Sequence, residues 1–256
     1  MFTSLRRKKL KRRPFPPSWV AVLERSIPLY RRLSEVDRSE LRGLIQVFLA
    51  EKMFEGGAGF KITDDVRVII AAQACILLLH RKASYYPGLS SIIVYPDEYV
   101  APFREIDEWG IITEGTDRRS GELIREGALV LSWRDVLAHE IAVHNGYNVV
   151  LHEFAHQLDA EEGITAGIPC DAGEADLTGK DILSREYLRL READERGIET
   201  VLDPYGAESP EEFFAVATEA FFQTPLPLWK HHPELYGVLA LYFRQDPATW
   251  PDEGVT

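Results

Sequence analysis

Cysteine is scarce in this chain, with two among 256 residues. Cys75 and Cys170 lie far apart in the sequence, and Cys75 belongs to an apolar run. Two cysteines are too few for a disulfide framework or for a zinc site built from thiolates. The scarcity fits a reducing compartment, so we expect a cytoplasmic protein. Any bound metal must then be held by nitrogen and oxygen ligands.

Long apolar runs are also missing. The longest, residues 66–79, contains Arg67 and Gln73 and is shorter than the roughly 20 residues that cross a bilayer. A proline cluster at residues 14–17 follows the basic N-terminal segment, where a secretory signal would need a continuous apolar stretch. We therefore expect a soluble protein that does not associate with membranes.

Acidic residues outnumber basic ones, and the two signs are separated along the chain. The whole chain carries −12 and its first thirteen residues carry +7, so residues 14–256 carry −19. A basic segment of this kind can contact nucleic acid or anionic lipid. Because the acidic remainder repels phosphate groups, we interpret residues 1–13 as a disordered tail and expect no direct binding of nucleic acid.

The segment VVLHEFAHQL at residues 149–158 places a His-Glu-x-x-His motif inside an apolar run that predicts a buried helix. His152 and His156 are four residues apart, so they lie about 40° apart around a helix and project from one face. Two such rings can share a Zn²⁺ ion at roughly 2.0–2.1 Å per nitrogen. Glu153 can then reach a metal-bound water rather than the metal itself. The motif predicts a zinc metallopeptidase.

Other interpretations of the histidines are weaker. A buried helix with hydrogen-bonded core histidines would leave Glu153 among apolar residues without a partner, which is costly. Upstream, His139 and His144 are five residues apart and diverge by about 140° on a helix, so they cannot share an ion from one face. We interpret this second pair as surface histidines.

The pattern of apolar residues predicts an α+β fold, because strands come early, helices come late and the two do not alternate regularly. We expect helices over residues 19–30, 39–54 with Ser39 or Asp37 as cap, 66–79 with Thr63 or Asp64 as cap, and 184–197. We expect strands at residues 91–95, 122–124 and 128–133, loops at 56–59 and 163–179, and a polar connection after Trp133. Residues 14–256 are predicted to be one peptidase domain, with a helical portion at 14–90 and the catalytic core at 91–256.

A catalytic zinc needs a third protein ligand beyond two histidines. Residues 209–222 predict a phenylalanine-rich helix, capped by Ser209, that carries Glu212 and Glu219. The spacing from Ser209 to Glu212 also fits a capping box, which would explain Glu212 without any metal, so both interpretations stay open. Glu219 is a second candidate ligand. Asp159, on the motif helix itself, is better placed as a partner to a ligand ring.

Eight short motifs, spread over most of the chain, are specific only when they are taken together. They are HEFAHQLD at 152–159, DPYG at 203–206, EFFA at 212–215, FEGG at 54–57, AAQAC at 71–75, VLSW at 130–133, HPELY at 232–236 and YFRQDP at 242–247. Together they resemble the Mlc titration factor A family of zinc peptidases, whose catalytic core is similar to that of anthrax lethal factor. The resemblance implies a zincin-like domain, one zinc ion, Glu212 as its third ligand and Tyr205 facing the metal.

The chain departs from the family at residues 139–144, where a loop richer in glycine or aspartate is expected. This departure concerns the access of substrate, because the metal-binding motifs are intact.

The motif and the resemblance together predict hydrolysis of peptide bonds in a peptide or protein substrate, with an aminopeptidase among the possible types. Glu153 is expected to accept the proton of the attacking water, and Tyr205 to stabilise the oxyanion. Enzymes built this way extend the substrate along a sheet edge, for which residues 128–133 are the candidate. Their unbroken apolar character is equally consistent with an interior strand.

Two other classes of function stay open. The resemblance implies association with a transcriptional repressor of sugar uptake, and in that case the chain is a binding protein whose zinc is structural. Its acidic surface would attract a basic DNA-binding partner. A zinc-dependent deacylase or amidase would use the same ligands, because the chemistry of the metal does not choose the acyl substrate.

Overall fold

The computed structural model describes most of the chain. The described residues are 2–82, 84–97, 99–106, 112–119, 121–124, 127–141, 146–166 and 179–251. Helices predominate and accompany a small mixed sheet, so the predicted α+β class is confirmed.

Four helices open the chain: α1 (Phe2–Lys11), α2 (Pro17–Ser26), α3 (Pro28–Arg32) and α4 (Glu35–Glu51). The single helix predicted over residues 19–30 is split, because Pro28 has no backbone N–H to continue α2 and begins α3 instead. The predicted cap of α4 was wrong. Ser34, rather than Ser39 or Asp37, is the N-cap, and its side chain accepts a hydrogen bond from the N–H of Asp37.

Helix α1 corrects the prediction of a disordered tail. Arg7 donates two hydrogen bonds to Glu51 on α4, at 2.8 and 2.7 Å, and its guanidinium lies 4.5 Å from the centre of the Tyr85 ring. Leu10 is buried in the core. A ten-residue helix is marginal alone in water, so these contacts with the acidic body are what hold it.

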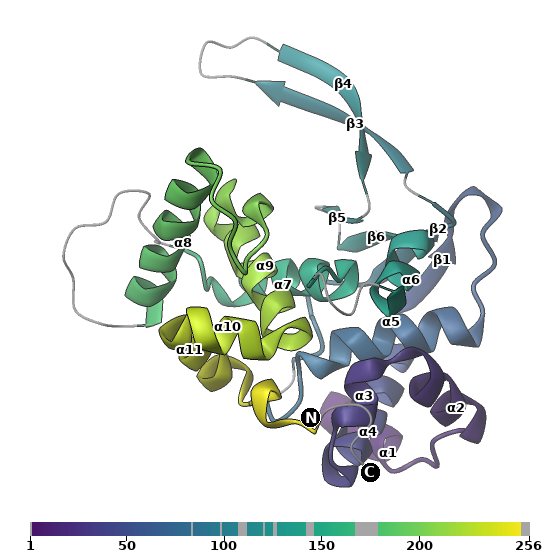
Figure 1. Ribbon diagram of the computed structural model, residues 1–256. Coiled ribbons are helices and arrows are strands. Elements are labelled where there is room, and N and C mark those ends of the chain that lie inside the picture. The colour runs from purple at the N-terminus through teal and green to yellow at the C-terminus, as the bar shows by residue number, and fades with distance from the viewer. Residues whose placement is uncertain are drawn as a thin grey trace.

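The main sheet has the strand order β1 (Met53–Gly56), β2 (Ser91–Tyr95), β6 (Ala128–Ser132) and β5 (Gly121–Ile124). Strands β1, β2 and β6 are parallel, and β5 runs antiparallel to β6. Strands β3 (Tyr99–Ile106) and β4 (Ile112–Arg119) form a separate antiparallel hairpin, which extends away from the sheet at the top of Figure 1.

Strand β1 was not predicted, since Met53 and Phe54 were assigned to the end of a helix and Gly56 to a loop. Helix α4 stops at Glu51, and the chain continues extended from Lys52 to pair with β2. The predicted helical portion at residues 14–90 therefore contributes a strand to the sheet of the following portion. The division of the chain at residue 90 remains a prediction.

Strand β6 is an interior strand, so its assignment as the sheet edge was wrong. It pairs with β2 on one side and with β5 on the other, and four of its five residues are buried. Because both faces of β6 are buried, its residues are apolar without the alternation of a half-exposed strand. Strand β5 is the end of the sheet within the described residues, and it lies against helix α7 (Val149–Glu162).

Helix α5 (Asp64–Ile76) is capped by Thr63, as predicted, and every residue from Val68 to Ile76 is buried. It packs against α2, α4 and α7 and so links the N-terminal helices to the rest of the core. In Figure 1 the N-terminal helices lie on one side of α5, and the sheet lies on the other. The glycine-rich loop predicted at residues 56–59 contains a short 3₁₀ turn, η1 (Gly57–Gly59).

The remaining elements are helical. They are α6 (Trp133–Ile141), α8 (Gly179–Glu195), η2 (Pro204–Ala207), α9 (Pro210–Gln223), α10 (Pro225–His231), α11 (Pro233–Phe243) and η3 (Pro247–Thr249). The polar connection predicted after Trp133 is therefore wrong over the length of α6. Among the described residues, no helix has both the length and the apolar character needed to span a bilayer.

A buried hydrogen bond joins α8 to the start of α11. Glu186 Oε2 lies 2.6 Å from Nδ1 of His232, and both residues are almost fully buried. Burial alone would raise the pKa of Glu186, but the hydrogen bond from His232 and the charges of Arg189 and Arg185 outweigh burial, so the pKa is lowered. The ionised carboxylate therefore stabilises the folded state.

This pair predicts a pH dependence of stability. Because the pKa of Glu186 is lower in the folded state, its contribution is complete above about pH 4.3 and is lost as the pH falls through the folded value. Glu186→Gln should reduce the free energy of unfolding at about pH 6, and the difference from the unchanged protein should shrink towards about pH 3. Urea unfolding at both pH values measures this, and a difference that grows in acid would contradict the assignment.

Candidate metal centre

Helix α7 carries the two motif histidines. The helix begins at Asn148, whose side chain accepts a hydrogen bond from the N–H of Leu151 at 3.0 Å. It ends at Gly163, whose φ of +63° lies in the left-handed region that favours glycine. His152 and His156 stand one turn apart, with ring centres separated by 4.8 Å. The predicted projection of both rings from one face is therefore present.

Helix α9 brings Glu212 to the same place. Ser209 caps the helix and accepts a hydrogen bond from the N–H of Glu212 at 3.1 Å. A buried face of phenylalanine holds the helix against its neighbours: Phe213, Phe214, Phe221 and Phe222. One of the two hydrogen bonds of the predicted capping box, from the Glu212 N–H to the Ser209 hydroxyl, is thus present. The carboxylate of Glu212 lies against the histidines of α7 instead of completing the box.

Three ligand atoms converge between α7 and α9. Nε2 of His152 lies 3.1 Å from Nε2 of His156 and 3.0 Å from Oε2 of Glu212, and the third side of the triangle is 3.3 Å. Two unprotonated imidazole nitrogens and a carboxylate oxygen so close together repel one another unless a cation lies among them. A single proton can bridge only one pair of these atoms, whereas a metal ion satisfies all three.

The size of the triangle fits a transition-metal ion. Ligands that bind at roughly 2.0–2.1 Å with tetrahedral angles are separated by about 3.3 Å. The three observed separations are 3.0–3.3 Å. His152, His156 and Glu212 are also the one group of potential metal ligands found within the described part of the chain. The donor set and its spacing therefore suit a metal ion.

Glu219 lies behind the cluster and does not join it. Its Oε1 lies 2.7 Å from Nδ1 of His152, and its Oε2 accepts a hydrogen bond from the backbone N–H of Asn148. The carboxylate therefore fixes which nitrogen of His152 faces the cluster, and it ties the start of α7 to α9. Glu219 was predicted as an alternative ligand, and this structure gives it a supporting contact instead.

The charges of the cluster are strongly coupled. Burial lowers the pKa of His152, but its hydrogen bonds to Glu212 and Glu219 raise it to about 10. Burial raises the pKa of Glu212, but its hydrogen bonds with His152 and His156 outweigh burial and lower the pKa to about 2. Glu219 differs because burial dominates and raises its pKa. The site thus holds ionised Glu212 and favours positive charge beside it.

Glu153 is buried next to His152, with 7% of its surface exposed. Burial raises the pKa of its carboxyl group, although the nearby histidines act in the opposite direction. A carboxylate with a raised pKa is a better proton acceptor than one free in water.

Tyr205 lies over the cluster from the 3₁₀ turn η2. Its ring centre is 5.9 Å from that of His152, and 48% of its surface is exposed. The turn is held close to the core by Gly206, where an added Cβ would lie 3.0 Å from a side-chain carbon of Leu190 and 3.4 Å from Cα of Phe213. The predicted position of Tyr205 facing the metal ligands is consistent with this contact.

Comparison with known sequences identifies the family. A model of the family described as glucose-regulated metallo-peptidase M90 matches residues 2–244. The chain belongs to this family. Membership supports a metallopeptidase-like domain, and it points to a metal ion at the cluster of His152, His156 and Glu212.

Curated relatives extend over most of the chain. "Uncharacterized protein slr2042" of Synechocystis is 41% identical over 244 residues, covering 94% of this chain and 89% of its own length. "Mlc titration factor A" of Edwardsiella ictaluri is 30% identical over 225 residues, covering 87% of this chain and 85% of its own. A protein of the same name from Yersinia pestis is 28% identical over 225 residues. The predicted resemblance to the Mlc titration factor A family is confirmed.

Asp159 does not have the role that was predicted for it. Its two carboxylate oxygens accept hydrogen bonds from the backbone N–H and the hydroxyl of Thr165, at 2.7 and 2.5 Å. Asp159 therefore closes the turn that follows α7, and Glu219 supports the ligand ring in its place. The sequence contained a signal for this contact of Glu219, because an acid on a phenylalanine-rich helix needs a buried partner.

Most of the upstream segment with His139 and His144 lies outside the residues, or the side chains, that the structure describes. His144 lies outside the described residues, and for His139 the structure describes the backbone of α6 but not the side chain. The interpretation of the pair as surface histidines remains a prediction.

Glu219 gives a prediction for metal affinity. Glu219→Gln keeps the shape of the side chain but removes the charge that holds His152 Nδ1–H, so zinc affinity should fall by about 10–100-fold. Competition with a coloured chelator measures this. Glu211→Gln on the exposed side of α9 is the matched control, and an equal loss in both variants would contradict a supporting role.

Proposed function

We propose that this M90 protein is a zinc-dependent peptidase whose metal is held by His152, His156 and Glu212. The observation that carries the proposal is the triangle of two imidazole nitrogens and one carboxylate oxygen with sides of 3.0–3.3 Å. Two nitrogen donors and one oxygen donor, with the fourth position open to water, are typical of catalytic zinc. A zinc ion there would supply a Lewis acid that lowers the pKa of water towards about 7.

Glu153 is the proposed general base. It follows His152 directly and is buried beside the cluster, so it can accept a proton from the attacking water. The same carboxyl group then returns the proton to the leaving amine of the cleaved peptide. Its raised pKa suits both steps, because the protonated form is populated closer to neutral pH.

Tyr205 is the proposed donor to the oxyanion. Tyr205→Phe should lower kcat by about 10²–10³-fold while KM and zinc content change little, because the hydroxyl acts on charge that develops in the transition state. Steady-state kinetics on one peptide, with zinc analysis, measures this. Tyr187→Phe is a control, since the Tyr187 hydroxyl faces the backbone of Ala207. An unchanged kcat in Tyr205→Phe would contradict the assignment.

Strand β5 is the proposed docking edge for the substrate backbone. It is the antiparallel end of the sheet and lies against α7, the helix that carries the motif. A peptide can pair with such an edge and extend past the metal ligands. The cluster suits both aminopeptidases and endopeptidases, and the scarcity of cysteine supports a cytoplasmic setting.

Cleavage of a peptide library tests the proposal. The purified chain is assayed with its native metal, after removal of metal by a chelator, and after zinc is restored. Activity that is lost and then regained with about one zinc per chain supports a zinc peptidase. Absence of cleavage at full zinc occupancy overturns it, and cleavage confined to acylated amines or esters would indicate a deacylase or amidase instead.

A second proposed activity is capture of a DNA-binding repressor. It is supported by the name of relatives that are about 30% identical, Mlc titration factor A, and by the net charge of −12, which attracts basic proteins. His156→Ala separates the two activities. If cleavage is lost and capture of the repressor Mlc is retained, the chain has two independent activities, whereas no capture by the unchanged protein removes the second one.

A further inference from the structure

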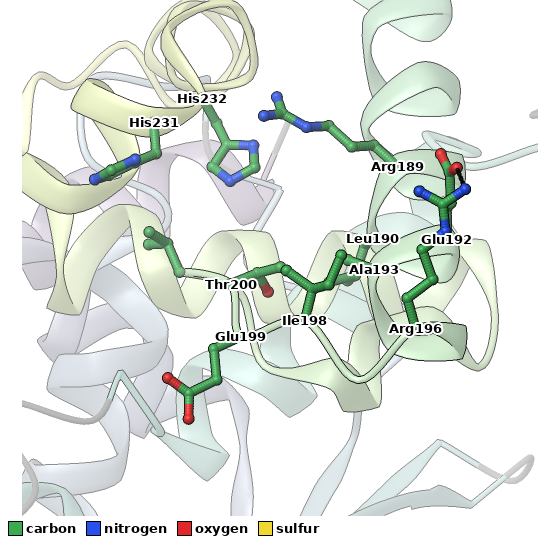
Figure 2. Close-up of a pocket in the computed structure, with 11 residues that line it drawn as sticks. Arg189, Leu190, Glu192, Ala193, Arg196, Ile198, Glu199, Thr200, His231 and His232 are labelled. Atoms are coloured by element: carbon green, nitrogen blue, oxygen red, sulfur yellow. Dashed lines mark ion pairs between the residues drawn. The ribbon is translucent and has the colours of Figure 1, made fainter.

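A pocket of about 530 Å³ lies away from the metal cluster. It is bounded by the second half of α8, by residues 198–201 and by the junction of α10 and α11 (Figure 2). This volume falls within the range of about 300–1,000 Å³ that is usual for small-molecule sites. None of the residues that line it belongs to the metal cluster, and residues 198–201 lead directly into the turn that carries Tyr205.

One part of the pocket is apolar. Leu190 and Ala193 face it from α8, and Ile198 and Val201 face it from the following segment. Ile198 is 56% exposed and Leu190 is 3% exposed, so Ile198 offers more of this apolar surface than Leu190 does. These side chains form a surface that an apolar group of a ligand would cover.

Arg189 supplies a cation whose N–H groups are available to bind a ligand. Its one ion pair within the described part of the chain is with Glu186, at 3.7 Å, which is too long for a hydrogen bond. In Figure 2 its guanidinium extends into the pocket towards the ring of His232. The planar guanidinium group can bind a carboxylate through two parallel hydrogen bonds.

His232 supplies an acceptor held in a fixed orientation. Its Nδ1 lies 2.6 Å from Oε2 of Glu186, so Nδ1 carries the hydrogen and donates it to the carboxylate. In the neutral ring, Nε2 is then an acceptor, and the ring lines the pocket. An N–H group of a ligand is the natural partner for this nitrogen.

We infer that this pocket binds the C-terminal residue of a peptide with an apolar side chain. The terminal carboxylate pairs with Arg189, the amide N–H donates to Nε2 of His232, and the side chain covers Leu190 and Ile198. Each part of such a residue meets a group of matching chemistry. Binding there requires no metal, so the inference stands apart from the proposed peptidase activity.

The other charged residues of the pocket leave this recognition intact. Arg196 is paired with Glu192 at 2.7 Å, so that pair adds little net charge. The carboxylate of Glu199 points away from Arg189 and His232 in Figure 2. Arg189 is therefore the cation that faces the apolar surface.

The test is a titration of the full zinc-loaded chain with N-acetyl-leucine, followed by NMR. Two probes each remove one contact: N-acetyl-leucinamide lacks the carboxylate, and 4-methylpentanoate lacks the amide N–H. N-acetyl-leucine should bind saturably and about tenfold or more tightly than either probe, because each loses a directed hydrogen bond, to Arg189 or to His232. No saturable binding, or equal binding of the amide, overturns the inference.

Variants distinguish the pocket from the metal cluster, which could also bind a carboxylate. Arg189→Gln should weaken N-acetyl-leucine by about tenfold or more, whereas Arg191→Gln on the same helix and outside the pocket lining should leave it unchanged. Ala193→Phe fills the apolar part and should abolish binding while zinc content and thermal stability are kept. Binding that persists in Ala193→Phe, or falls equally in both arginine variants, overturns the inference.

Discussion

Replacing Glu153 by glutamine is expected to abolish most hydrolysis while zinc stays bound. Glutamine fills the same buried space beside His152 but cannot accept a proton, so kcat/KM should fall by about 10²–10⁴-fold. The three groups of the metal cluster are untouched by this change. Peptide cleavage and zinc analysis on the same sample measure both quantities.

A control on the same helix makes this result specific. Glu162→Gln changes an acid at the exposed end of α7 whose carboxylate pairs with Arg81 at 2.7 Å. Its turnover should match that of the unchanged protein, because the carboxylate of Glu162 contacts Arg81 and Tyr242 and is not one of the three ligand groups. Retained turnover in a zinc-loaded Glu153→Gln variant would end the general-base assignment and leave the cluster as a structural site.

Replacing Glu212 by glutamine should have the largest effect on metal binding. The carboxylate supplies the charged corner of the triangle, 3.0 Å from His152 and 3.3 Å from His156. A neutral amide is a poor zinc ligand, so the loss of affinity should exceed the roughly 10–100-fold expected for a supporting residue such as Glu219. Zinc affinity measured against a competing chelator gives the comparison.

Glu211→Gln is the matched control, one position earlier on α9 and exposed to solvent. It should bind zinc as the unchanged protein does, and both variants should keep the hydrogen bond between the backbone N–H of residue 212 and Ser209. If Glu212→Gln keeps its zinc, Glu212 would have only its capping role. The third ligand would then have to be another group.

The fold was predictable where a segment's own pattern decides its structure. Helix α5 is apolar nearly throughout and has a threonine cap, and β2 is β-branched between a glycine and a proline, so both were identified. Strand β1 was missed because its four residues form a strand only by pairing with β2. Helix α1 was missed for a similar reason, since its order depends on Glu51 and Tyr85, which are distant in sequence.

The site was predicted in the same uneven way. The spacing of His152 and His156 placed both rings on one helical face, because helix geometry is a local property. Spacing along α9 could not decide between a capping box and a ligand for Glu212, and packing of α7 on α9 brings its carboxylate to the histidines. The same packing gives Glu219, rather than Asp159, the contact with His152.

By itself the sequence determined the α+β class, the helix that carries the His-Glu-x-x-His motif and the nitrogen and oxygen character of the site. These depend on residue type and on contacts within a few positions. Only the tertiary structure decided which distant carboxylate meets the histidines, which one supports them, which strand forms the edge of the sheet and which charges hold helix α1. Each of these depends on two segments that approach in space, and a list of residues does not contain that approach.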